Sequence, residues 1–174
     1  ETLSQTSTTK QISELLTALR ELTESYNFIF IGSNSDTGSD EIMKEILRFC
    51  QLTNSRLFKS VKPEEYLALN KYSQGLIGNS SSGLIEIPSL LVPTINIGNR
   101  QKGRVRGTTV IDCACSAETI KSAILLSQGA DFQRSLQFAE NPYYKKAVLE
   151  SAVNVIKSFV FNEKEHYKDF YDLD

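Results

Sequence analysis

Hydrophobic residues occur along the chain in short continuous runs and at helical spacing, and the two patterns together predict an α/β fold. The runs predict five strands, at residues 26–31, 56–60, 75–79, 94–97 and 108–113. Apolar positions three and four apart predict helices at residues 8–24, 40–50, 63–72, 116–125, 131–140 and 148–159. Strands that alternate with helices favour a doubly wound parallel sheet, and a length of 174 residues suits one domain over residues 1–174.

The expected order of the strands brings two loops together. The run at residues 26–31 is almost wholly apolar, which predicts a central strand buried on both faces. With the strands at Leu57 and Leu76 on either side of it, the strand order reverses between the first strand and the third. Ligands bind at such a reversal, so loops 32–39 and 78–83 are expected to flank one crevice.

A serine-rich turn follows the third predicted strand. It reads Gly78-Asn79-Ser80-Ser81-Ser82-Gly83 and leads into an apolar segment. Amide N–H groups at a helix start have no partner in the helix, and with serine hydroxyls and a glycine they favour a bound phosphate. The alternative is an ordinary serine N-cap, which a serine-rich turn taken alone would favour.

Glu86 lies about one turn beyond the serines. The residue three before it is Gly83, so Glu86 is not the acid of a capping box. Its carboxylate could accept hydrogen bonds from a ribose diol beside a bound phosphate, although an acid in the first turns of a helix also stabilises that helix by its charge. Pro88, two residues later, predicts that the helix is short or kinked.

Two further loops carry polar candidates. Residues 98–106 hold four cations; such a run is usually a solvated loop, but after a neighbouring strand it could cover a diphosphate with charged donors. The loop at residues 32–39 has two interpretations. It is a turn with Ser39 as the N-cap of the next helix, or it places Asn34 or Asp36 at the carboxyl end of the strand, facing the ligand crevice.

Charge and cysteine content narrow the class of protein. The net charge of −2 argues against non-specific nucleic-acid binding, and the apolar runs are too short for a membrane span or a signal peptide. Three cysteines without C-x-x-C spacing indicate reduced thiols and a cytoplasmic location. The sole histidine, His166, has no evident partner for a Ser/His/Asp triad, and no pattern signals a metal or an organic cofactor.

Two long motifs resemble the carboxy-terminal half of UDP-N-acetylglucosamine 2-epimerases. They are GNSSSG with Glu86, and the strand from Val92 to Gly98 followed by Arg100-Gln101-Lys102-Gly103-Arg104. The resemblance is closest to the hydrolysing branch that feeds sialic acid and related nonulosonate synthesis. It implies a Rossmann-like domain that forms the second half of a GT-B-type two-domain fold, so the chain is expected to be a fragment without its amino-terminal domain.

The resemblance also implies a reaction and residue roles. UDP-N-acetylglucosamine loses the C2 proton, UDP leaves by anti elimination to give 2-acetamidoglucal, and hydration gives N-acetylmannosamine. Glu86 would hold the ribose, Arg100 would stabilise the leaving diphosphate, and the main chain near Lys59 would face the base. The full set of implied nucleotide-binding residues is Ser80, Ser81, Ser82, Gly83, Glu86, Arg100 and Lys59. Asn34 and Asp36 are the catalytic candidates, with neither assigned.

Acid and base carboxylates of the family come largely from the amino-terminal half, so the fragment alone is expected to bind UDP weakly and to lack turnover. Three alternatives stay open: a UDP-N,N'-diacetylbacillosamine 2-epimerase, the donor domain of a GT-B glycosyltransferase, and a non-catalytic nucleotide-sugar sensor. Non-hydrolysing bacterial relatives tend to read Asp-Ser-Gly-Gly with two glutamates and a Thr-Glu-Arg-Pro loop, and the absence of both patterns favours hydrolysis. The expected partners are UDP or UDP-N-acetylglucosamine, the amino-terminal domain and, as an open alternative, a second copy of the chain.

Overall fold

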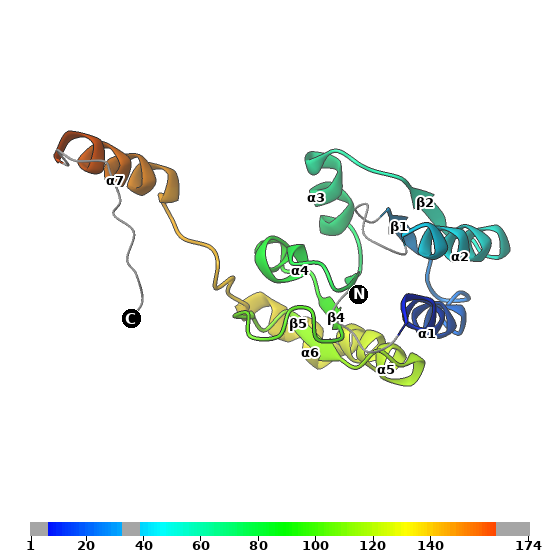
Figure 1. Ribbon diagram of the computed structural model, residues 1–174. Helices are drawn as coiled ribbons and strands as arrows, with labels where there is room; N and C mark the ends of the chain where they lie inside the picture. Colours follow the sequence, from blue (N-terminus) through cyan, green and yellow to red (C-terminus); the bar gives the residue numbers. More distant parts are fainter. Residues whose placement is uncertain (1–6, 33–38, 163–174) are drawn as a thin grey trace, which may run out of the picture. The chain divides into compact units, whose positions relative to one another are not determined.

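The computed structural model describes residues 7–32 and 39–162 (Figure 1). The chain forms two compact units, Glu1–Tyr143 and Tyr144–Asp174. The described part of the second unit contains one helix, α7 (Val148–Asn162), whose apolar side chains, among them Leu149 and Phe161, are exposed. In the described ranges, no helix combines the length and the apolar character needed to span a bilayer.

The first unit alternates strands and helices as the hydrophobic pattern predicts. Its strands are β1 (Ile29–Ile31), β2 (Arg56–Phe58), β3 (Leu76–Gly78), β4 (Thr94–Ile97) and β5 (Val110–Cys113). Its α-helices are α1 (Thr8–Arg20), α2 (Ser39–Leu52), α3 (Pro63–Lys71), α4 (Ser82–Ile85), α5 (Ala117–Gln128) and α6 (Ala130–Ser135). Two 3-10 helices, η1 (Ile87–Leu90) and η2 (Leu136–Phe138), continue α4 and α6. The predicted α/β class with parallel strands is therefore confirmed.

The described strands form two parallel sheets rather than one. β1 pairs with β2, and β4 lies between β3 and β5 in a three-stranded sheet. The expectation that the strand at Leu76 lies beside the first strand is wrong for the described strands, because β1 pairs with β2 alone and β3 is the edge strand of the other sheet. The first strand is also not buried on both faces, since Ile29 is 53% exposed. An apolar run alone does not reveal how many neighbours a strand has, and here the fully buried strand is β4.

The two faces of β4 serve different purposes. Ile95 and Ile97 join the main hydrophobic core, to which α1, α2 and α5 contribute Leu16, Leu19, Phe49, Ile120 and Ile124. Thr94 and Asn96 alternate with them and so point to the opposite face, where α4 packs on the sheet (Figure 1). The parallel register places Gly78 of β3 opposite Asn96 of β4. Both strands therefore end at one edge, and the segments that follow them begin side by side.

Candidate functional site

The serine turn connects β3 to a very short helix. β3 ends at Gly78, whose φ of 153° favours glycine, and α4 begins at Ser82 and has only four residues. The prediction that Pro88 shortens this helix is confirmed, because η1 takes over at Ile87. A single turn has little macrodipole, so attraction for an anion must come mainly from individual N–H and O–H donors.

Some backbone amides of the serine turn donate hydrogen bonds within the turn, and others have no acceptor in the described part of the chain and are open to a ligand. The N–H of Gly83 donates to the Ser80 oxygen at 3.2 Å, and that of Ser82 donates to Oγ of Ser80 at 3.3 Å. Within the described residues, the amides of Ser80 and Ser81 meet no acceptor. The open donors therefore lie at the start of the turn, two or three residues earlier than Gly83.

The three serine side chains have different surroundings. Oγ of Ser82 accepts a hydrogen bond of 2.9 Å from the hydroxyl of Tyr66 on α3. Ser80 is exposed and its Oγ caps the Ser82 amide, whereas Ser81, the N-cap residue, makes no side-chain capping bond. Each hydroxyl keeps its own proton when it accepts a bond, so all three serines can still donate to an anion.

Gly83 is buried and packs against β4. A Cβ at this position would lie 2.5 Å from Cγ2 of Thr94. The glycine that the sequence assigned to close approach of an anion thus has a packing reason as well: it lets α4 lie directly on the sheet.

Glu86 is the C-cap residue of α4 and is exposed. Its amide donates to the Ser82 oxygen at 2.9 Å, so Glu86 lies one helical turn beyond Ser82 and on the same face. In the described part of the chain, its carboxylate takes part in no ion pair. The carboxylate is therefore exposed to solvent near the serines and is not part of the hydrophobic core.

The basic loop, residues 98–106, is fixed to the serine turn by Gln101. This side chain is 3% exposed, and its Nε2 donates to the Asn79 oxygen at 2.7 Å. Sequence reasoning named Gln101 only as a letter of a motif and missed this contact. The signal for it was the motif position itself, a neutral amide among four cations.

Arg106 differs from the other cations of the basic loop. Its Nε forms a 2.9 Å ion pair with Asp112 on β5, and its Nη2 donates to the Gln101 oxygen at 3.0 Å. Arg100, Lys102 and Arg104 are exposed and, in residues 7–32 and 39–162, form no ion pair. Of the four cations that the sequence grouped together, one supports the loop and three can attract an anion.

A second connection comes from Asn141-Pro142-Tyr143. Nδ2 of Asn141 donates to the Ile85 oxygen at 2.8 Å and to Oγ of Ser89 at 2.6 Å, which holds α4 and η1. The hydroxyl of Tyr143 donates to the Val105 oxygen at 3.1 Å, which holds the basic loop. This tripeptide therefore contacts α4, η1 and the basic loop at once.

The remaining predicted residues are not brought to this place by any described contact. Lys59 follows β2 and is exposed. Asn34, Asp36 and His166 lie outside the described residues. The described residues contain no group of three or more His, Cys, Asp or Glu side chains that could hold a metal ion.

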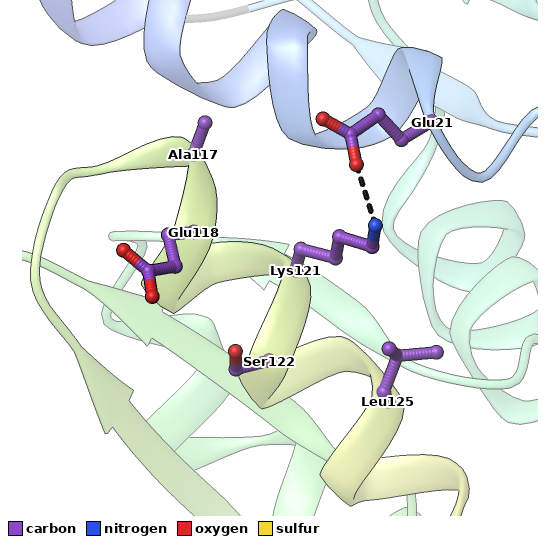
Figure 2. Close-up of a pocket in the computed structure, with 6 residues that line it drawn as sticks. All are labelled: Glu21, Ala117, Glu118, Lys121, Ser122 and Leu125. Atoms are coloured by element: carbon purple, nitrogen blue, oxygen red, sulfur yellow. Dashed lines mark hydrogen bonds and ion pairs between the residues drawn. The ribbon is translucent and has the colours of Figure 1, made fainter.

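A surface pocket lies elsewhere, between the end of α1 and the outer side of α5 (Figure 2). Figure 2 shows the ion pair between Glu21 and Lys121 beside Glu118, Ser122 and Leu125. Exposed ion pairs of this kind contribute little to the stability of the fold. The pocket shares no residue with the serine turn or the basic loop. Its shape is explained by two packed helices with long charged side chains.

Known proteins resemble both the sequence and the fold. The chain is 51% identical to polysialic acid biosynthesis protein P7 of Escherichia coli, over 99% of this chain and 44% of that protein. It is 39% identical to GDP/UDP-N,N'-diacetylbacillosamine 2-epimerase (hydrolyzing) of Campylobacter jejuni, over 64% of this chain and 29% of that protein. The chain thus spans less than half the length of these relatives.

Solved structures show the same fold at low sequence identity. The complex of S. aureus MnaA with UDP matches with a TM-score of 0.70 and 19% identity, over 93% of this chain and 45% of that one. A crystal structure of a UDP-N-acetylglucosamine 2-epimerase matches with a TM-score of 0.65 and 14% identity, over 92% and 43% of the two chains. These are GT-B-type proteins, which confirms the predicted fold class. Residues 1–157 match the sequence profile of UDP-N-acetylglucosamine 2-epimerase, and the chain belongs to that family.

Proposed function

We propose that this chain is the UDP-binding part of a hydrolysing UDP-N-acetylglucosamine 2-epimerase. The observation that carries the proposal is the bond from Gln101 to Asn79, because it ties the basic loop, with three cations that form no ion pair among the described residues, to the turn that carries the open amides and hydroxyls. Open N–H donors and arginine side chains are the groups that proteins use to bind diphosphates. Family membership and the UDP in the S. aureus complex support the same ligand.

Each candidate residue has a role in this proposal. The amides and hydroxyls of Ser80 and Ser81 and the hydroxyl of Ser82 donate to diphosphate oxygens, while Gly83 lets the turn approach the ligand. Glu86 accepts hydrogen bonds from the ribose diol, and the main chain at Lys59 faces the base. Arg100 stabilises the charge on UDP as it leaves.

The reaction proposed is elimination followed by hydration. A base takes the C2 proton, the C1–O bond breaks with its electron pair passing to UDP, and 2-acetamidoglucal forms. Water then adds across the double bond, with the hydroxyl at C1 and a proton at C2, to give N-acetylmannosamine. The acid and base are assigned to the rest of the full-length protein, with Asn34 and Asp36 as candidates within this chain, so residues 1–174 alone are expected to lack turnover. The proposal includes a cytoplasmic location, which the reduced cysteines support.

An assay of the full-length protein tests the activity. Incubated with UDP-N-acetylglucosamine and no acceptor, it is expected to release UDP and N-acetylmannosamine in equal amounts. Unchanged nucleotide sugar would overturn the proposal and favour a glycosyltransferase or a sensor. The name of the Campylobacter relative makes the diacetylbacillosamine nucleotide the necessary competitor substrate, and the higher kcat/KM identifies the sugar.

Calorimetry with UDP tests the residue assignment. Ser81→Ala and Glu86→Ala are expected to weaken binding by about three- to tenfold each, the value of one or two hydrogen bonds. Ser122→Ala and Glu118→Ala, which make the same changes in the pocket of Figure 2, are the controls and are expected to bind as the wild type does. Equal affinities for all four variants would remove the site from the serine turn.

A further inference from the structure

We propose that Gln101 is a positioning residue: without touching the nucleotide, it sets the affinity for the diphosphate by fixing Arg100 beside the serine turn. This inference rests on the proposed function and deepens it. Gln101 is among the most buried polar residues described, with 3% of its surface exposed, although both of its neighbours in sequence are exposed cations. Its side chain joins two segments 22 residues apart.

The backbone around Gln101 forms a turn that presents Arg100. The amide of Lys102 donates to the Asn99 oxygen at 2.9 Å, so Arg100 and Gln101 occupy the two central positions of a turn. Adjacent Cα atoms lie about 3.8 Å apart. Fixing the Gln101 side chain on Asn79 therefore places the base of the Arg100 side chain close to the residue that precedes Ser80.

The other side of Gln101 is held from the sheet. Arg106 donates to the Gln101 oxygen at 3.0 Å and is paired with Asp112 at 2.9 Å. Asp112 in turn accepts a bond of 2.6 Å from Nδ2 of Asn96 on the buried strand β4. A continuous chain of polar contacts thus runs from the sheet to the serine turn, with Gln101 as its last member.

The unused oxygen of Gln101 points to the same role. Oε1 is buried and has no hydrogen-bond partner within the described residues. Such an atom costs stability, about 1 to 3 kcal/mol for a buried polar group without a partner. An apolar side chain of the same size would avoid that cost, so the glutamine is explained by the bond that its Nε2 makes to Asn79.

The decisive experiment is a double-mutant cycle on UDP affinity in the full-length protein. Gln101→Met keeps the volume of the side chain and removes the donor, and Arg100→Ala removes the cation. We expect Gln101→Met to weaken UDP binding roughly tenfold, about the value of one charge-assisted hydrogen bond. In the Arg100→Ala background, the same change should weaken binding by less than about twofold, because the group it positions is gone.

Two further variants provide a matched control and a substitute for Gln101→Met. Gln128→Met is the matched control, since Nε2 of Gln128 also donates to a distant backbone oxygen, that of Gln74, at 3.0 Å, and it should leave UDP affinity unchanged. Asp112→Asn removes the charge that Arg106 pairs with and so acts on the same loop from the side of the sheet. It should weaken UDP binding in the same way, and it replaces Gln101→Met in the test if that variant does not fold. Additive effects of the Gln101 and Arg100 changes, with wild-type protein that binds UDP, would overturn this inference alone. Wild-type protein that does not bind UDP would overturn the proposed function and this inference with it.

Discussion

The hydroxyl of Tyr66 on α3 donates a 2.9 Å hydrogen bond to Oγ of Ser82, sixteen residues further along the chain. The bond satisfies one lone pair of the serine and leaves its proton to point away from Tyr66. The third serine of the turn is therefore pre-oriented by a neighbouring helix, which lowers the entropy lost when an anion binds.

Tyr66→Phe should weaken UDP binding by about three- to tenfold, because the ring stays in place while the orienting donor is lost. Tyr72→Phe is the matched control, since the Tyr72 side chain is 84% exposed at the end of the same helix. Titration calorimetry on the two variants measures the difference. Equal affinities would mean that the Tyr66 hydroxyl has no part in binding.

Gly83→Ala should lower the free energy of unfolding by about 1 to 3 kcal/mol, the usual cost of overpacking. The added methyl group would lie 2.5 Å from Cγ2 of Thr94, and Thr94→Ser removes that carbon atom. The double variant should therefore regain much of the lost stability. Gly75→Ala, where the nearest atom is the Pro93 oxygen at 3.4 Å, is the control. Urea unfolding measures the free energy of unfolding of each variant. A double variant no more stable than Gly83→Ala would contradict the packing explanation.

Asn141→Ala should lower the free energy of unfolding by about 1 to 3 kcal/mol, since the Ile85 oxygen and Ser89 Oγ both lose a donor. Hydrogen exchange should rise selectively at the amides of α4 and η1. The exposed residue Asn54 provides the control substitution, Asn54→Ala. Exchange that rises equally over the whole chain would show general destabilisation and not the loss of a local clamp.

Cys113 should react slowly with iodoacetamide in the native chain. Burial, with Cys115 and Asp112 nearby, raises the pKa of its thiol from 9.0 to about 11. At pH 8 the native thiol then holds roughly a hundredfold less thiolate than the unfolded one, and mass spectrometry with and without urea measures the ratio of rates. Between pH 9.0 and about 11 the native state keeps a proton that the unfolded state has lost, so stability falls as pH rises through this window. Equal rates in both states would show that the thiol is not shielded.

Much of the fold follows from local pattern, and most of what it misses concerns neighbours. Strand β4 and the short helix α4 lie where the apolar run and Pro88 predict them. The separation of β1 from β3 did not follow from the sequence, because an apolar run records burial and not the identity of the strand beside it. The same limit applies to Gln101, whose partner Asn79 lies in a different loop.

The sequence by itself determined the order of the elements, the serine turn, the basic loop and the family resemblance, since these depend on spacing within a few residues. Only the tertiary structure decided which serine meets Tyr66, which arginine is used up by Asp112 and which glutamine joins the two loops. These contacts depend on the parallel register that sets Gly78 opposite Asn96 and so ends both strands at one edge. Register is fixed by side-chain packing across the whole sheet, and no short stretch of sequence encodes it.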